Sequence, residues 1–301
     1  FGMSLMEVYD PEPNTWHRLA DMPTARAEPM TAVVAGKIYV LAGYVGKDNQ
    51  GVNLKFLKAV EMYDPQTDTW VQKQDMPTPR IEFGTGVVAG KIYAIGGRVH
   101  PRDKPGGPWR LALVEVYNPA TDTWTKRAKM PTRRSKIKAA VVRDTIYAIG
   151  GAGWPQVGNH GGPFLGTIEV YEPRINRWMK KPEMPNLRRV SSMVVIDDKI
   201  YLIAGNAVQA GGAAVGERLA SIEVYEPVIE RWHLIPTAPA LQLPFSVAAV
   251  SGKIYIFGGD TEDWELSPDV EVFDTGFRAV EAVGKLPVRW GALKMEPQSQ
   301  P

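Results

Sequence analysis

Short apolar segments separated by turn residues run along most of the chain. Residues 84–97 alternate small and apolar side chains on both sides of a turn at Gly90, which predicts a β-hairpin. Residues 113–117 form a further apolar segment, Pro119 marks the turn after it, and Trp124 starts a last segment. This unit therefore predicts four short strands, and no helix is needed to explain it.

The four-strand unit recurs along the chain at a constant spacing in sequence, which is the number of residues from Tyr63 to Tyr117. An Ile-Tyr pair in the second strand keeps that spacing, and so do a Tyr in the third strand and a Trp in the fourth. The Tyr series is Tyr9, Tyr63, Tyr117, Tyr171 and Tyr225, followed at a shorter interval by Phe273, and the Trp series is Trp16, Trp70, Trp124, Trp178 and Trp232. Repeated four-stranded units of about 50 residues are typical of a β-propeller.

The turns inside the predicted hairpins support this interpretation. Each hairpin has a two-residue connection rich in Gly and Asp, residues that tolerate a positive φ in tight turns. The connections are Ala35-Gly36, Ala89-Gly90, Arg143-Asp144, Asp197-Asp198 and Ser251-Gly252.

The repeated strings resemble a known family. Residues 92–97, 115–119 and 123–124, followed by Met130-Pro131, are similar to the kelch repeat, which has paired glycines, then Tyr, then Trp. The resemblance covers nearly the whole chain and implies an all-β fold, a six-bladed kelch-type β-propeller that forms one domain over residues 1–301. The departures from the pattern are Ala42 and Ala204 for the first glycine, Phe273 for Tyr and Val280 for Trp.

Five repeat units are expected, and a sixth blade is expected to close the ring. The five units span about 26–79, 80–133, 134–187, 188–241 and 242–288. Residues 5–19 supply only third and fourth strands, while residues 289–295 align with a first strand. The sixth blade is therefore expected to be closed by the N- and C-terminal strands, from residues 289–301 plus 1–25, with three or four strands.

Composition excludes several classes of function but leaves the compartment unassigned. The chain has 301 residues and no cysteine, which excludes disulfides, thiolate metal sites and cysteine nucleophiles. No apolar segment approaches the roughly 18–20 residues that cross a bilayer, and the first residues do not resemble a signal peptide. A formal charge of +2 does not by itself indicate nucleic acid or membrane as a partner.

Function is expected where the units differ, because residues common to every unit are structural. In propellers, the loops between second and third strands and the segments that lead into each first strand open on one face around the central channel. The first set carries Tyr44, Trp109, Trp154, His160 and Trp264. The lead-in segments carry Glu28, Glu82 and Lys136 at one equivalent position, with Arg80, Arg134 and Arg189 beside it. In the kelch proteins that this chain resembles, ligands commonly engage this mouth.

Two alternatives stay open for these candidates. The aromatic side chains suit sugar faces, peptides and partner surfaces, but they can equally pack their own loops. The arginines can hold a polar or ionic ligand, but each can also pair locally with an acid or a backbone carbonyl.

The charge of the chain is unevenly distributed. Residues 98–143 hold 12 basic and three acidic side chains, whereas residues 260–281 hold eight acidic side chains and one arginine. A ring with one basic and one acidic side can orient a charged partner. Solvated surface is the simpler explanation.

The leading hypothesis is a binding module that presents its loop-rich funnel face to a protein or peptide partner. The alternative is a carbohydrate-binding protein or a sugar-active enzyme resembling a sialic acid mutarotase, with Glu82 or Glu28 as acid/base and an arginine as anion clamp. An oxidase resembling galactose oxidase is excluded because it needs a cysteine. We predict no catalytic residue, cofactor or metal site for the binding module, and neither a nucleic acid nor a membrane as partner.

Overall fold

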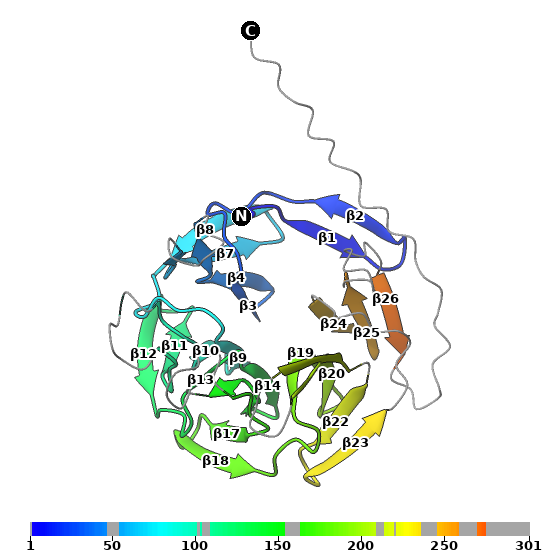
Figure 1. Ribbon diagram of the computed structural model, residues 1–301. Helices are drawn as coiled ribbons and strands as arrows, with labels where there is room; N and C mark the ends of the chain where they lie inside the picture. The colour runs from blue at the N-terminus through cyan, green and yellow to red at the C-terminus, as the bar shows by residue number, and fades with distance from the viewer. Residues whose placement is uncertain are drawn as a thin grey trace.

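The computed structural model describes residues 2–46, 54–100, 103, 109–153, 163–208, 214–219, 221–235, 246–258 and 270–274. The regular elements in these ranges are β-strands, arranged as radial sheets around a common axis (Figure 1). Within the same ranges, no helix is long and apolar enough to cross a membrane.

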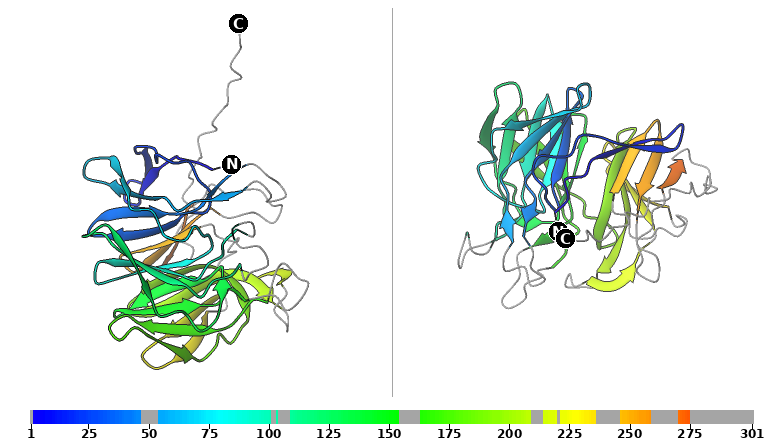
Figure 2. Two further views of the ribbon diagram at one scale, coloured as in Figure 1. Left: turned by 90° about the vertical axis from the view of Figure 1, so that its left-hand side faces the viewer. Right: turned by 90° about the horizontal axis from the view of Figure 1, so that it is seen from above.

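Five sheets in the described residues form the blades (Figures 1 and 2), and the first strand of each is innermost (Figure 1). Blade 1 contains β3 (Met30–Val34), β4 (Lys37–Leu41), β7 (Val60–Asp64) and β8 (Thr69–Lys73). Blade 2 contains β9 (Gly84–Val88), β10 (Lys91–Ile95), β11 (Val114–Asn118) and β12 (Thr123–Arg127). Blade 3 contains β14 (Lys138–Val142), β15 (Thr145–Ile149), β17 (Ile168–Glu172) and β18 (Arg177–Lys181).

Blades 4 and 5 complete the set. Blade 4 contains β19 (Arg188–Ile196), β20 (Lys199–Val208), β22 (Ile222–Glu226) and β23 (Arg231–Ile235), with β21 (Ala214–Arg218) paired to β20. Blade 5 contains β24 (Ser246–Val250), β25 (Lys253–Phe257) and β26 (Val270–Asp274). Two short pairs lie in the loops, β5 (Tyr44–Val45) with β6 (Lys55–Phe56) and β13 (Arg134–Ser135) with β16 (Ala152–Gly153).

The prediction of six blades is wrong, because the structure has five kelch blades. The N-terminal strands β1 (Glu7–Asp10) and β2 (Thr15–Arg18) pair with each other and form a separate two-stranded sheet. That sheet lies in the sector between blade 1 and blade 5 (Figure 1). In the part of the chain that the structure describes, β1 pairs with no strand other than β2, and the expected closing segment 289–301 lies outside that part. Within the described residues, no first or second strand joins this two-stranded unit.

The repeated residues form the blades by two local interactions. The hairpin connections adopt the left-handed conformation as predicted, with φ of 48° at Ala89 and 68° at Gly90. On the third and fourth strands, Tyr117 lies opposite Trp124, and their rings are 5.2 Å apart. Tyr117 is fully buried because its ring also reaches the preceding blade, 5.9 Å from Tyr39. The hydrophobic core accordingly consists of layers between neighbouring blades.

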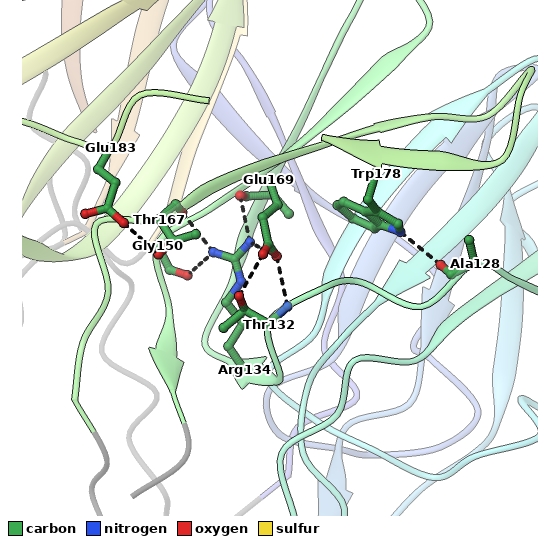
Figure 3. A network of polar contacts seen from close by, with 9 residues as sticks. Ala128, Thr132, Arg134, Gly150, Thr167, Glu169, Trp178 and Glu183 are labelled. Carbon is green, nitrogen blue, oxygen red and sulfur yellow. Dashed lines mark hydrogen bonds and ion pairs between the residues drawn. The ribbon is translucent and has the colours of Figure 1, made fainter. Parts of the chain in front are cut away.

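A second repeated contact joins neighbouring units at their outer edge. The backbone N–H of Ala128 in blade 2 donates to Asn176 of blade 3 at 2.8 Å, and Trp178 Nε1 donates to the Ala128 carbonyl at 2.9 Å (Figure 3 shows the Trp178 contact). Tyr171 Oη donates to the same Asn176 oxygen at 2.7 Å. We call this three-bond arrangement the outer clamp.

The outer clamp occurs at two further junctions. Between blades 1 and 2, Asp122 accepts from the Gln74 N–H and from Tyr117, and Trp124 donates to the Gln74 carbonyl. At the junction of blade 1 with the N-terminal sheet, Asp68 accepts from the N–H of Ala20, which follows β2, and from Tyr63, and Trp70 donates to the Ala20 carbonyl. Each clamp satisfies buried polar groups that would otherwise weaken the interface between units.

Candidate functional site

The innermost strands line a central channel. A cavity of about 330 Å³ lies between the first four blades, lined by Thr31, Thr85, Gly86, Ala139, Val141, Met193 and neighbouring residues. These strands approach one another closely, since a Cβ on Gly84 would lie 2.8 Å from the Ala139 Cβ. The channel wall is therefore small and apolar, and charged groups gather where the strands begin.

The mouth of the channel is built by backbone pairing of each lead-in segment. Ala27 exchanges two hydrogen bonds with Tyr44, and Ile81 exchanges two with Arg98, at 2.9 to 3.0 Å. In blade 4 the equivalent pairing is part of the sheet, with Arg189 opposite Asn206. This pairing places the variable lead-in positions beside the variable residue that follows each second strand.

The equivalent lead-in residues share an unusual backbone conformation. Glu28, Glu82 and Lys136 have φ of 47°, 57° and 55°, in the left-handed region that non-glycine residues adopt at a cost. The turn lets the residue project toward the mouth before the first strand starts. The Lys136 N–H donates to the Glu82 carbonyl at 2.8 Å, so neighbouring blades are also tied together here.

Lys136 is the residue around which the mouth charges converge. The surrounding protein removes part of its hydration, which lowers its pKa from the ordinary value, and the carboxylate of Glu82 opposes this. Arg189 and Arg98 lower the pKa further, while Glu28 raises it. Five charged groups from four blades therefore lie close enough to influence one another.

Lys138 adds a further cation at the first position of β14. Desolvation lowers its pKa, and Arg189 on the neighbouring inner strand lowers it further. Lys136, Lys138, Arg98 and Arg189 outnumber Glu28 and Glu82, so the described part of the mouth is cationic. Among the described residues, neither Lys136 nor Arg189 makes an ion pair.

Glu82 is held by an arginine beside it. Arg98 Nε lies 3.1 Å from the Glu82 carboxylate, and the Arg98 guanidinium lies over the Phe56 ring at 5.2 Å from its centre. Phe56 in turn meets His100 edge to face at 5.2 Å. Behind them, buried Arg110 donates to Ser135 Oγ at 3.3 Å. Arginines and aromatic rings thus form the rim between blades 1 and 2.

Two predicted mouth residues lie elsewhere. Arg80 and Arg134 are fully buried inside blades 2 and 3, not at the mouth. Arg134 donates to Glu169 at 2.9 Å and to the carbonyls of Gly150 and Thr167 at 2.7 and 2.9 Å (Figure 3). Arg80 is paired with Glu115 at 3.1 Å in the same way. Burial lowers the pKa of both guanidinium groups, and the paired carboxylate opposes this shift.

The buried arginine–glutamate pair recurs in four blades, which explains why Arg80 and Arg134 do not lie at the mouth. Its members are Arg26–Glu61, Arg80–Glu115, Arg134–Glu169 and Arg188–Glu223. The arginine recurs at the spacing of the Tyr and Trp series, and so does the glutamate. Repetition at that spacing was the available signal that these arginines are structural, and local pairing was the alternative that the sequence had left open.

The remaining candidates lie at or near the mouth, or outside the described residues. Glu28 is exposed, Tyr44 is half-buried in β5 and tied to Ala27, and Trp109 is half-buried with its carbonyl accepting from Val99. Trp154, His160 and Trp264 lie outside the described residues.

Sequence reasoning missed Arg98 and Lys138 as mouth residues. Arg98 follows the second glycine of its repeat, the same offset at which Tyr44 follows Gly43. That shared offset could have identified Arg98. Lys138 had no comparable signal, because nothing in its local pattern separates the mouth end of a first strand from the rest.

The fold and its mouth define a class of protein, a β-propeller of kelch-type blades with a charged funnel. A family model described as the Kelch motif matches residues 25–77, 79–131, 133–185, 188–239 and 243–287. The chain belongs to the kelch-repeat family.

Curated relatives agree with this family, and a solved structure shares the fold. The chain is 29% identical to Kelch-like protein 36 of Rattus norvegicus over 88% of its length, and 26% identical to Kelch-like protein 35 of Mus musculus over 92%. It spans only 41% and 42% of those two proteins. The structure of YjhT matches with a TM-score of 0.73 at 16% identity, covering 94% of this chain and 97% of that chain, which shows a shared fold.

The described ranges contain no cluster of side chains that could bind a metal ion. Among those residues, no three His, Asp or Glu side chains lie close enough to hold a metal ion.

Proposed function

We propose that this propeller is a binding module whose channel mouth takes an acidic segment of a protein or peptide partner. The observation that carries the proposal is the convergence of Arg98, Lys136, Lys138 and Arg189 from three blades around one opening. Loops and strand ends held by a rigid scaffold are where binding residues concentrate.

The acidic character of the ligand follows from the charge balance of the mouth. Lys136 and Lys138 have lowered pKa values partly because Arg189 lies near both. A carboxylate placed between these cations relieves their mutual repulsion and replaces lost hydration with charge-assisted hydrogen bonds. Glu82 already holds Arg98 by an ion pair, so the Lys136–Arg189 side of the mouth is where an added carboxylate gains most.

The test is binding of short fluorescent peptides of equal length, one rich in Asp and Glu, one rich in Lys and one of Ser and Gly. The acidic peptide should bind best, and its affinity should fall as salt rises from about 50 to about 200 mM because the attraction is screened. Lys136→Glu and Arg189→Glu should each weaken binding by about tenfold.

Lys126→Glu is the matched control, since Lys126 lies exposed on the outer strand of blade 2 and changes the net charge equally. Equal losses in all three variants would reduce the effect to overall charge and contradict a specific mouth site. The same conclusion follows if the acidic peptide binds no better than the Ser-Gly peptide.

A saccharide is the competing ligand for the same mouth, and a thermal-shift experiment tests it. The Glu82–Arg98 pair beside Lys136 places a carboxylate and cations together, as acid/base chemistry on a sugar would need. A thermal shift with N-acetylneuraminate that Glu82→Gln abolishes, without a shift from the acidic peptide, would replace the peptide proposal with a sugar site.

A further inference from the structure

The outer clamp is absent at the junction between blades 3 and 4. The position that donates and accepts at the three clamped junctions (Ala20, Gln74 and Ala128) is Pro182 here, and the acceptor position is Glu230. Within the described residues, Tyr225 Oη and Trp232 Nε1 are buried and find no hydrogen-bond partner, whereas Tyr171 and Trp178 of blade 3 are both satisfied. In the described part of the chain, this junction therefore lacks the three bonds that the three clamped junctions make.

Both substitutions account for the loss. Proline has no N–H, so the first bond of the clamp cannot form at Pro182. Glu230 keeps the backbone of its counterparts, with φ of 53° against 52° at Asp122, but its side chain is one methylene longer. Its carboxylate instead meets Lys181 at 2.5 Å, in a pair whose lysine is 26% and whose glutamate is 42% exposed. Such a partly exposed pair stabilises little, and it leaves the buried Tyr225 hydroxyl and Trp232 N–H without hydrogen-bond partners among the described residues.

The inner end of the same junction carries like charges. Lys138 starts β14 of blade 3 and Lys136 lies just before it, while Arg189 lies near the start of β19 of blade 4; β14 and β19 are neighbouring inner strands (Figure 1). Each lysine is disfavoured as a cation by Arg189. The apolar layer between these blades is intact, with Tyr147, Ile200 and Leu202 buried in it, so the weakness is polar and lies at both ends.

We propose that the junction between blades 3 and 4 is the hinge at which this propeller opens, and that a carboxylate bridging Lys136 and Arg189 closes it. The first half stands on the missing outer clamp alone, whereas the second half rests on the proposed function of the mouth. A ligand shifts such an equilibrium only by binding one state better, and two cations on opposite sides of a hinge provide that difference.

Hydrogen exchange with and without a restored clamp tests the hinge. In the unmodified chain, amides of β18 and β23 should exchange faster than those of β8 and β12, because β8 and β12 each have a clamp at both of their junctions. Pro182→Ala together with Glu230→Asp rebuilds the donor and the acceptor. Exchange in β18 and β23 should then slow by roughly fivefold to tenfold.

Single variants separate the clamp from other effects of removing a proline. Glu230→Asp alone lacks the backbone donor, and Pro182→Ala alone lacks the shorter acceptor, so the protection in the double variant should exceed the combined effect of the two. Asp122→Glu at the junction of blades 1 and 2 is the reciprocal control and should speed exchange there. Equal exchange at all junctions, or purely additive variants, would overturn the hinge whether or not any peptide binds.

The acidic peptide tests the second half. It should slow exchange in β18 and β23 of the unmodified chain, and it should bind a few-fold more tightly to the Pro182→Ala, Glu230→Asp variant, whose closed state needs no ligand to form. Peptide binding that leaves exchange at this junction unchanged would overturn ligand closure while keeping both the hinge and the mouth site. Failure of the peptide to bind at all would overturn the mouth site and ligand closure together, and the exchange data would still decide the hinge.

Discussion

The Arg134 guanidinium lies 2.9 Å from the Glu169 carboxylate, and both side chains are completely buried. Thr132 Oγ1 donates to the same carboxylate at 2.7 Å, so the pair is held inside a satisfied network (Figure 3). This network joins the lead-in segment of blade 3 to its second and third strands. It holds the lead-in segment that carries the mouth residue Lys136.

Breaking that buried pair should destabilise the protein strongly. Glu169→Gln leaves a buried guanidinium without its counter-charge, and we expect a loss of about 3–5 kcal/mol in the free energy of unfolding. Guanidinium chloride denaturation measures it. Arg174→Ala is the control, because the Arg174–Asp144 pair is 84% and 57% exposed and its loss should cost less than about 1 kcal/mol. Replacing both partners together, as Arg134→Met with Glu169→Leu, should cost less than Glu169→Gln; a larger cost would contradict this explanation.

Alkaline pH should unfold the protein through its repeated tyrosines. Burial raises the pKa of Tyr171 and Tyr225 from 10.0 to about 12. A group whose folded-state pKa is raised stabilises the fold fully below its unfolded pKa, and this contribution is lost as pH rises from about 10 to about 12. The melting temperature should fall over that range, and the ultraviolet absorbance of phenolate should appear cooperatively with unfolding. The phenolate signal of these two residues is the part that is lost in the Tyr171→Phe, Tyr225→Phe variant, and its appearance at pH 10 in the folded protein would contradict the assignment.

Gly151 should not tolerate a side chain. Its φ is +91°, and a Cβ there would lie 2.5 Å from the Ser135 carbonyl oxygen. We expect Gly151→Ala to cost about 2 kcal/mol or more, from backbone strain and from separation of the β13–β16 pair beside the mouth. Gly90→Asn is the matched control, since a Cβ at Gly90 meets nothing within 4 Å and Asn accepts its φ of +68°. Thermal unfolding of the two variants provides the comparison, and equal melting temperatures would refute the steric argument.

Glu82 should compete with an acidic ligand. Glu82→Gln releases Arg98, now 3.1 Å from the carboxylate, and removes a negative charge near Lys136. Binding of the acidic peptide should strengthen by about 1 kcal/mol, roughly fivefold, at low salt. Fluorescence anisotropy measures the change. Glu12→Gln, at an exposed position in the N-terminal turn, should leave the affinity unchanged; a similar gain there would show that only net charge matters.

Much of the fold could be predicted from local sequence. The Ile, Tyr and Trp series identified the strands, and the Gly- and Asp-rich connections identified the hairpin turns, because strand alternation and positive φ depend on neighbouring residues only. The candidate site was less accessible. Glu82 and Lys136 were grouped by their equivalent offset, and the structure brings them close together. Arg80 and Arg134, two residues earlier in each segment, were expected at the mouth but are buried inside the blades.

The sequence by itself determined the repeat, the family and the strands of each blade, since each of these is encoded within a single repeat unit and copied along the chain. Only the tertiary structure decided the number of blades, the burial of the repeated arginines and the meeting of Arg98, Lys136 and Arg189. The left-handed turn at residues 28, 82 and 136 breaks the alternation of side chains, so local pattern does not tell which neighbour faces the channel. Charges from separate blades come together only when the ring brings distant segments side by side, and no local signal records that proximity.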